Sequence, residues 1–240
     1  MYFLIDCVLA AVYHADNIVE VHIPGDNVSS RQETPQYWGL LFILVGPPGV
    51  GKNAIMNTVM GRLADLHQVA TATTRSMRPN EEQGREHLFL NREAFQQMID
   101  RDELVEWQTV HEHLYGTPRA SVESAIMHEA DVIADIEVLG ATYLHSMYPH
   151  NVIRVFIQPP SVEELINRMS KRGETQEAIE LRMRRVDMEM AYAPQCDYLI
   201  TNVDLEASSE ILYSIVLAER SKRAVLQLRA KKNSLEPFAV

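Results

Sequence analysis

The sequence predicts an α/β fold in which a parallel β-sheet is flanked by α-helices. Two observations support this class. From residue 40 onward, short apolar runs of strand length alternate with longer stretches whose apolar residues recur at helical spacing. A glycine-rich segment at residues 46–53 stands between the first apolar run and the first helical pattern, which is where such a fold carries a phosphate-binding loop.

The expected elements follow this alternation along the chain. The first strand covers residues 40–45, and the helix after the glycine-rich segment has apolar residues at Ile55, Val59, Leu63 and Leu66. The later elements are strands at 131–135, 152–157 and 198–201 and helices at 138–147, 162–171 and about 205–230. Only the stretch between the first helix and residue 131 departs from simple alternation.

Length, charge and cysteine content limit the class of protein. A chain of 240 residues has room for one well-packed globular unit. Its 33 acidic and 22 basic residues give a net charge of −11, which disfavours a broad nucleic-acid surface. Cys7 and Cys196 form no metal-ligand or redox spacing, so we expect reduced thiols and a cytoplasmic location.

The first 37 residues precede the alternation. Residues 3–12 are apolar but include Asp6 and fall short of the roughly 20 residues that a membrane span needs, so we expect no membrane anchor. Residues 25–36 are rich in turn formers and predict a linker. We therefore expect an extension and linker at 1–37, with a strand pair in the extension, a main domain at 38–232 and a tail at 233–240.

The glycine-rich segment carries the most specific chemistry. It reads Gly46, Pro47, Pro48, Gly49, Val50, Gly51, Lys52 and Asn53. This is the pattern G-x-x-x-x-G-K, with Asn53 where Ser or Thr is normal. The glycines let backbone N–H groups face phosphate oxygens, and Lys52 reaches the outer phosphates. The pattern predicts a nucleoside triphosphate site, in which the amide of Asn53 is a weaker Mg²⁺ ligand than a hydroxyl.

Two further groups of polar residues have chemistry suited to phosphate and base recognition. Arg75 and Arg78 follow Thr71 and Thr73 and can clamp a phosphate monoester, although a solvated arginine pair explains the pattern about as often. Glu106 can accept from the N1–H and exocyclic amine of guanine, whereas a lone glutamate in an edge strand is usually solvated. Neither group decides a function alone.

Taken together, the motifs from about residue 40 to about residue 230 resemble those of the guanylate kinase family. The matching segments after the loop are Thr71–Pro79, Leu104–Trp107, Leu114–Thr117, Asp135–Glu137, the arginines Arg168, Arg172, Arg182 and Arg185, and Ile200–Asp204. Several separate motifs in one order make the resemblance specific.

The resemblance implies a fold and an activity. The fold is a P-loop NTPase-like parallel sheet flanked by helices, with a mixed-strand GMP-binding subdomain inserted at about 72–130 and a helical lid at about 160–195. The activity is Mg²⁺-dependent transfer of the γ-phosphoryl group of ATP to GMP, giving ADP and GDP. ATP and GMP are then the partners, with no nucleic acid or membrane, and no motif indicates the number of subunits.

The resemblance also implies roles for individual residues. ATP is bound by Gly46, Pro47, Pro48, Gly49, Val50, Gly51, Lys52, Asn53, Arg168 and Asn202. GMP is bound by Thr71, Arg75, Arg78, His87, Glu106, Tyr115, Thr117, Asp135 and Glu137. The catalytic residues are Lys52, Arg75, Arg172 and Arg182, and Mg²⁺ is held by Asn53 and, through water, by Asp135.

The helical spacing of the lid arginines gives a further expectation. Arg168 and Arg172 are four residues apart, and Arg182 and Arg185 are three apart, so each pair is expected on one side of its helix. Four guanidinium groups are then expected to face one cleft. The same arginines among many glutamates also fit a solvated, salt-bridged surface, and the other motifs favour the cleft.

His87 stands where the family has a tyrosine that contacts the GMP phosphate. A histidine can donate to the same oxygen, so we expect phosphate binding to depend on pH. His111 and His113 alternate in a strand-like run, and we expect sheet residues there rather than a transition-metal site.

Two alternatives to a guanylate kinase stay open at this point. A ribose 1,5-bisphosphate phosphokinase of related fold often lacks the hydroxyl after the loop lysine, but it has no use for Glu106 or the Tyr-Gly-Thr turn. A non-catalytic guanylate-kinase-like binding module is consistent with Asn53. Lys52 and the lid arginines argue against it, because a pure binding module does not need them.

Overall fold

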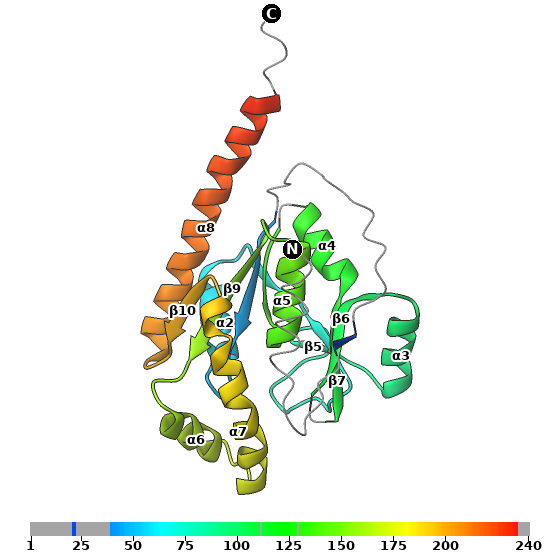
Figure 1. Ribbon diagram of the computed structural model, residues 1–240, viewed down its shortest axis with the longest axis vertical. Helices are drawn as coiled ribbons and strands as arrows, with labels where there is room; N and C mark the ends of the chain where they lie inside the picture. Colours follow the sequence, from blue (N-terminus) through cyan, green and yellow to red (C-terminus); the bar gives the residue numbers. More distant parts are fainter. Residues whose placement is uncertain (1–20, 23–38, 111, 129, 235–240) are drawn as a thin grey trace, which may run out of the picture.

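Two β-sheets and the helices around them make up the described part of the chain (Figure 1). This computed structural model describes residues 21–22, 39–110, 112–128 and 130–234. The strands are β1 (Val21–His22), β2 (Leu41–Val45), β3 (Leu66–Gln68), β4 (Thr71–Thr73), β5 (His87–Phe89), β6 (Leu104–Val110), β7 (His113–Pro118), β8 (Asp131–Asp135), β9 (Val152–Gln158) and β10 (Tyr198–Thr201). The helices are α2 (Lys52–Arg62), α3 (Arg92–Asp100), α4 (Arg119–Met127), α5 (Val138–Met147), α6 (Val162–Lys171), α7 (Gln176–Ala191) and α8 (Leu205–Ser234), with a 3-10 turn at Ala193–Gln195.

The first sheet is parallel, as the sequence predicts, with strand order β10-β9-β2-β8-β3. Its central strand β2 is apolar throughout and fully buried, because helices cover both faces of the sheet. Leu41 pairs with Val132 of β8 and with Val152 of β9. All five strands point the same way, so their carboxyl ends meet at one edge, where ligands of such sheets bind.

Side chains of β2 alternate between two hydrophobic cores. Phe42 and Leu44 pack with residues of α2, α6, α7 and α8 on one face. Leu41 and Ile43 pack with residues of α4 and α5 on the other. Figure 1 shows the corresponding layers, with α2 and α8 on one side of the sheet and α4 and α5 on the other. The predicted α/β class is confirmed.

The helix after the loop is shorter than its apolar pattern predicts. It ends at Arg62, because Leu63 takes a non-helical conformation (φ −121°, ψ 89°). Leu66 belongs to β3, where it pairs with Asp131. Both leucines are buried, at 8% and 3% exposure, from a turn and from a strand. The helical spacing therefore predicted correctly that Leu63 and Leu66 are buried, but it wrongly placed both in the helix. The chain leaves the helix after Arg62 so that β3 can pair with β8.

A buried carboxylate anchors the long last helix to the first sheet. Asp131, at the start of β8, is 4% exposed, and its Oδ1 accepts from the Leu40 backbone N–H at 3.0 Å. Arg220 of α8 donates to Oδ2 at 2.6 Å, and Arg223 also donates to this carboxylate. A buried charge needs such partners. Helix α8 continues to Ser234, beyond the predicted end near residue 230, and extends past the body (Figure 1).

The second sheet is mixed and has the order β1-β6-β7-β4-β5. Strands β6 and β7 pair antiparallel, whereas β4 and β5 pair parallel. A small core of Ala72, Phe95, Leu104 and Leu114 holds α3 against this sheet. Of the extension for which a strand pair is predicted, residues 21–22 form β1, which pairs with β6. The remainder of residues 1–37, with Cys7, the linker and residues 235–240, lies outside the described residues.

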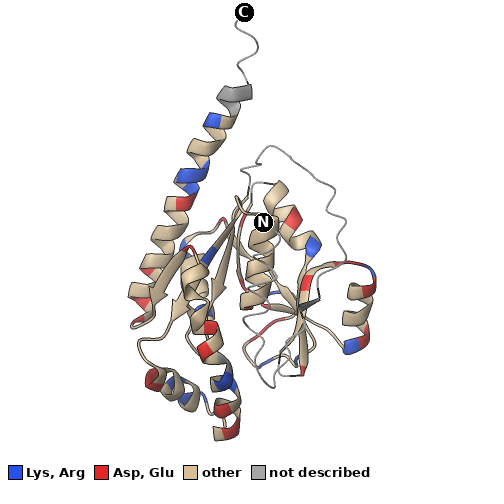
Figure 2. Ribbon diagram, viewed as in Figure 1, with Lys and Arg blue, Asp and Glu red and all other residues tan. Residues whose placement is uncertain are grey.

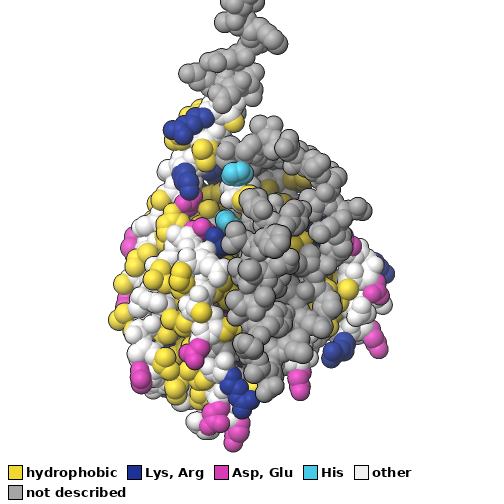
Figure 3. Space-filling model, in the orientation of Figure 1, with side chains coloured by type: hydrophobic (Ala, Val, Ile, Leu, Met, Phe, Trp, Pro, Cys, Tyr) yellow, Lys and Arg dark blue, Asp and Glu magenta, His cyan; other side chains and the backbone are white. Residues whose placement is uncertain are grey.

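The charges of the described surface are mixed. Figure 2 shows acidic and basic residues interspersed along α7, and Figure 3 shows basic side chains scattered over the visible face. Within residues 21–22, 39–110, 112–128 and 130–234, no helix combines the length and apolar character needed to cross a membrane.

Candidate active site

A cavity of about 230 Å³ lies where the carboxyl ends of β2 and β8 face the second sheet and the helices α6 and α7, for which the sequence predicts a lid. It gathers most of the residues that the sequence predicts for the site. Those that line it are Gly46, Pro48, Gly49, Gly51, Lys52, Asn53, Thr71, Arg75, Arg78, His87, Glu106, Tyr115, Thr117, Asp135, Glu137, Arg172 and Arg182. Pro47, Val50, Arg168 and Asn202 are not among the lining residues.

The phosphate-binding loop connects β2 to α2. Gly51 has φ +103°, and a Cβ there would lie 2.5 Å from Asn202 Nδ2, so a side chain is excluded by both conformation and space. Helix α2 begins at Lys52, so the unpaired N–H groups of its first turn and its positive end lie at the loop. The loop therefore has the geometry of an anion site.

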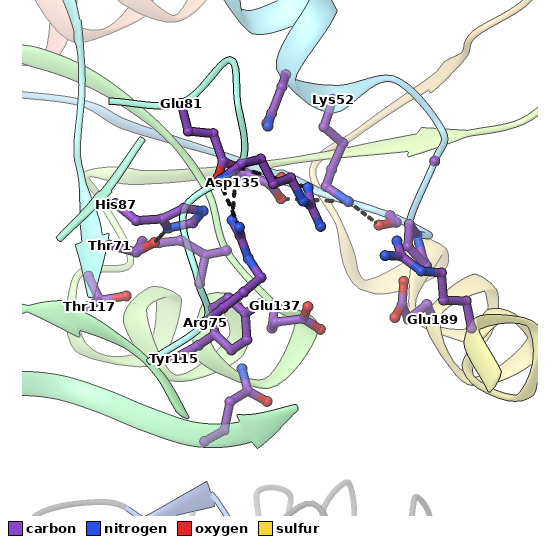
Figure 4. A pocket seen from close by; sticks show the side chains of 18 of the residues that line it. Lys52, Thr71, Arg75, Glu81, His87, Tyr115, Thr117, Asp135, Glu137 and Glu189 are labelled. Carbon is purple, nitrogen blue, oxygen red and sulfur yellow. Dashed lines mark hydrogen bonds and ion pairs between the residues drawn. The ribbon is translucent and has the colours of Figure 1, made fainter. Parts of the chain in front are cut away.

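Lys52 and Asp135 form an ion pair in the wall of the cavity. Lys52 Nζ donates to the Gly46 carbonyl at 2.5 Å and lies 3.6 Å from Asp135 Oδ1 (Figure 4). Burial raises the pKa of Asp135, and the Lys52 charge opposes this rise. A lysine and a carboxylate thus stand together beside the loop.

Arg75 is held in a forked pair with Glu81, a residue that the sequence analysis missed. Arg75 Nη1 and Nη2 donate to Glu81 Oε2 and Oε1 at 2.9 and 2.8 Å. The Arg78 backbone N–H donates to the same carboxylate at 2.8 Å. Figure 4 shows Arg75 and Glu81 pointing toward each other within the cavity. Glu81 therefore fixes the orientation of the guanidinium group. Its place shortly after two arginines was the available sequence signal.

His87 pairs with Thr71 beside these arginines. His87 Nδ1 lies 2.6 Å from Thr71 Oγ1, and its ring lies 6.1 Å from that of Tyr115. Burial lowers the pKa of His87 to about 4, and the Arg75 charge adds to this effect. The imidazole is therefore neutral near pH 7, so the pH dependence expected from His87 is not supported. A neutral ring whose Nδ1 accepts from Thr71 carries its proton on Nε2 and can still donate.

Glu106 forms the polar end of the cavity on the second sheet. It is 2% exposed, and Thr117 on β7 donates to its Oε1 at 2.6 Å. Its buried Oε2 has no hydrogen-bond partner in the part of the chain that the structure describes, and a Cβ at Gly140 would lie 2.8 Å from that atom. Burial raises the pKa of Glu106 to about 7, with a smaller rise from Glu137 and an opposing effect of Thr117. Because Gly140 of α5 lies against this carboxylate, Glu106 is buried and not solvated as a lone glutamate in an edge strand usually is.

The lid arginines do not all face the cavity. Arg172 caps α6 and Arg182 lies on α7, and both line the cavity. Arg168 instead bonds to Glu164 at 2.9 Å and to the Asn202 carbonyl at 2.9 Å. Of this predicted pair only Arg172 lines the cavity, so the expectation that all four guanidinium groups face one cleft is wrong for Arg168. The side chain of Arg185 lies outside the described residues.

Asn202 lies behind the loop rather than in the cavity. It is 5% exposed, its Nδ2 donates to the Val50 carbonyl at 2.7 Å, and its Oδ1 accepts from Ser208 at 3.0 Å. Arg168 Nη1 donates to the same Val50 carbonyl at 3.3 Å. Both side chains therefore brace the loop from outside.

Two more lining residues escaped the sequence analysis. Gln108 lies two residues after Glu106 in β6, so the period of two of a strand was the available signal. Glu189 of α7 is 4% exposed and lies across the cavity from His87 and Thr71 in Figure 4. No sequence motif distinguishes Glu189 from the other glutamates of that helix.

The parallel sheet, the glycine-rich loop and Lys52 at the start of α2 define a P-loop nucleotide-binding protein, and the opposite wall adds a second site with arginines and a buried carboxylate. The family model described as guanylate kinase matches residues 39–219. A guanylate kinase of Thermotoga maritima is 39% identical over 185 residues, covering 77% of this chain and 89% of the relative. One of Bradyrhizobium diazoefficiens is 40% identical over 186 residues, covering 77% and 85%.

A solved structure gives the same result. The crystal structure of guanylate kinase from Anaplasma phagocytophilum is similar with a TM-score of 0.64 and 26% identity, covering 76% of this chain and 86% of that one. The chain belongs to the guanylate kinase family. The predicted activity, that of an ATP:GMP phosphotransferase, is thereby confirmed.

Proposed function

We propose that GMP binds against the second sheet, with its base at Glu106 and its phosphate at Arg75. The observation that carries this assignment is the unpartnered, buried Oε2 of Glu106, whose carboxylate already accepts from Thr117. Guanine offers adjacent N1–H and amine donors to a carboxylate, whereas adenine has no donor at N1. Glu137 lines the same part of the cavity and takes the guanine amine.

The phosphate of GMP is assigned to the arginine end of the cavity. Arg75, oriented by Glu81, and Arg78 match the oxygens of a phosphate monoester. Tyr115, Thr71 and the Nε2–H of His87 supply neutral hydrogen-bonding groups around it. The acceptor oxygen then faces the phosphate-binding loop.

ATP is assigned to the loop on the other side of the cavity. The loop amides and Lys52 hold its β- and γ-phosphates, while Arg168 and Asn202 act through the Val50 carbonyl. A GMP phosphate oxygen attacks the γ-phosphorus, the bond to the bridging oxygen breaks, and ADP leaves. Arg172 and Arg182 neutralise the charge that spreads over the transferred group, and lid closure excludes water.

The donor set of the cavity fits Mg²⁺. Asn53 and Asp135 present an amide oxygen and a carboxylate beside the loop, and Mg²⁺ typically takes one or two protein oxygens together with phosphates and water. Bound there, Mg²⁺ would neutralise phosphate charge. Asn53 would contact it directly and Asp135 through water. Because an amide is a poorer Mg²⁺ ligand than a hydroxyl, Asn53 lowers the affinity of the site for the metal.

A cytoplasmic, reducing setting is part of the same proposal. It is supported by Cys196, which forms no disulfide within the described residues and whose pKa burial raises to about 12, so the thiol is unreactive at neutral pH. ATP and GMP are the small-molecule partners that this family implies.

The test is release of ADP from ATP and Mg²⁺ with GMP, AMP or ribose 1,5-bisphosphate as acceptor. We expect turnover with GMP, and we expect Asn53→Ser to lower the Mg²⁺ concentration for half-maximal rate several-fold. Turnover with ribose 1,5-bisphosphate but not GMP would establish the sugar-phosphate alternative. Binding of GMP without turnover, unrepaired in Asn53→Ser, would establish the non-catalytic module.

GMP affinity is expected to weaken as pH falls below about 7. Burial raises the pKa of Glu106 to about 7, so the ligand-free protein is increasingly protonated there below that pH. The guanine donors require the ionised carboxylate, so GMP binding must release the Glu106 proton. Well below pH 7 the GMP affinity therefore falls by nearly tenfold for each pH unit. Calorimetric titrations of GMP at pH 6, 7 and 8 measure the effect. Glu106→Gln should keep only the weaker dependence due to the GMP phosphate; an identical dependence in both proteins would contradict the prediction.

A further inference from the structure

Gln108 is a buried polar residue that the assigned roles leave unexplained. Its side chain is 2% exposed and lines the cavity. Among the described residues, its buried Oε1 has no hydrogen-bond partner. Buried polar side chains are nearly always paired, and leaving an acceptor unpaired costs stability. A polar side chain kept in this state at a ligand cavity points to a partner supplied by the ligand.

The strand register places Gln108 between the two ends of the GMP site. Glu106 lies opposite Thr117, and Gln108 lies opposite Tyr115. Residues two apart in a strand share a face, so both pairs face the cavity, about 7 Å apart along β6. The first pair belongs to the base end. The second adjoins His87, whose ring lies 6.1 Å from that of Tyr115, at the phosphate end.

A nucleoside monophosphate has its ribose between its base and its phosphate. With the base at Glu106 and the phosphate at Arg75 and Tyr115, the sugar lies along the stretch of wall that Gln108 occupies. We propose that Gln108 binds a ribose hydroxyl of the acceptor nucleotide and so selects the ribonucleotide. This inference rests on the proposed GMP site and adds the residue that reads its sugar.

The chemistry of the two groups matches. A hydroxyl donates one hydrogen bond and accepts others, and a primary amide offers both an acceptor oxygen and two N–H donors. The hydroxyl therefore supplies the donor that the buried Oε1 lacks. A deoxynucleotide would leave that oxygen unpaired, and an analogue that lacks a hydrogen-bonding group is rejected by such a site.

The test compares GMP with its 2′-deoxy and 3′-deoxy analogues in the unmodified protein and in Gln108→Met. Methionine has nearly the length and volume of glutamine without its polar atoms, so packing is kept. In the unmodified protein we expect one analogue to have a kcat/KM about tenfold below that of GMP, mostly through KM. In Gln108→Met we expect GMP to fall to the level of that analogue, so that the ratio approaches one.

Stability separates this role from a structural one. Removing an unpaired buried acceptor should leave the thermal midpoint of ligand-free Gln108→Met unchanged or higher, while GMP binding weakens. Gln96→Ala, an exposed position on α3, is the matched control and should leave every ratio unchanged. Equal use of all three nucleotides by the unmodified protein, or an unchanged ratio in Gln108→Met, would overturn the proposal.

The outcome is distinguishable from failure of the proposed function. Absence of GMP turnover in the unmodified protein would refute the kinase assignment of the cavity. The dissociation constants of the three nucleotides, measured by calorimetry in both proteins, would then decide the Gln108 contact in the same way.

Discussion

Replacing Lys52 with alanine is expected to lower kcat for transfer to GMP by about 10³-fold, the scale of losing a charged group that stabilises a transition state. Lys52 Nζ lies at the loop beside the Gly46 carbonyl and 3.6 Å from Asp135, where the proposed site puts the outer phosphates of ATP. Its charge is needed most when negative charge spreads over the transferred group. Steady-state kinetics with saturating ATP, Mg²⁺ and GMP measures the loss.

Two comparisons make this result specific. Lys222→Ala removes an exposed lysine of α8 that pairs with Glu219 at 3.2 Å, far along the chain from the loop, and should leave kcat unchanged. GMP affinity of Lys52→Ala should stay within a few-fold of the original value, since Lys52 lies on the donor side. Retention of more than a tenth of the original turnover would remove Lys52 from its assigned role.

Replacing Glu106 with glutamine is expected to reduce the preference for GMP over AMP by about 10²-fold. The buried carboxylate accepts from Thr117 with one oxygen and leaves the other for guanine. An amide keeps one acceptor but directs an NH₂ group at the guanine donors, which opposes binding. The ratio of kcat/KM for GMP to that for AMP measures the change.

The control for this variant is Glu103→Gln. Glu103 precedes β6, and its exposed side chain lies 3.8 Å from Arg101, outside the cavity. Its replacement should not alter the GMP to AMP ratio. If Glu106→Gln also left the ratio unchanged, Glu106 would not read the base, and the orphan oxygen would need another partner.

Neighbouring protein groups hold several site residues in place. Glu81 holds Arg75 in a forked pair, and Asn202 and Arg168 hold the loop through one carbonyl. Such fixed partners reduce the reorganisation that substrate binding would otherwise require. The two arginines of the proposed lid that line the cavity are Arg172, directly after α6, and Arg182 of α7.

Much of the fold could be predicted because its signals are local. The strands at 131–135 and 198–201 and the helices at 138–147 and 162–171 have the predicted bounds. A parallel strand buried on both faces is apolar throughout, and an amphipathic helix repeats its apolar residues at its own period. Leu66 was assigned to the helix instead of to β3, because a buried position is apolar in a helix and in a short strand alike.

The sequence by itself determined the loop, the order of the motifs and hence the family, since each depends on residues adjacent in the chain. Only the tertiary structure decided the rest: Glu81 as the partner of Arg75, Arg168 turned away from the cavity, and the oxygens of Glu106 and Gln108 that lack a partner among the described residues. The physical reason is that burial and hydrogen-bond pairing are properties of the space between distant segments. Strand register and helix ends create that space, and no local pattern encodes it.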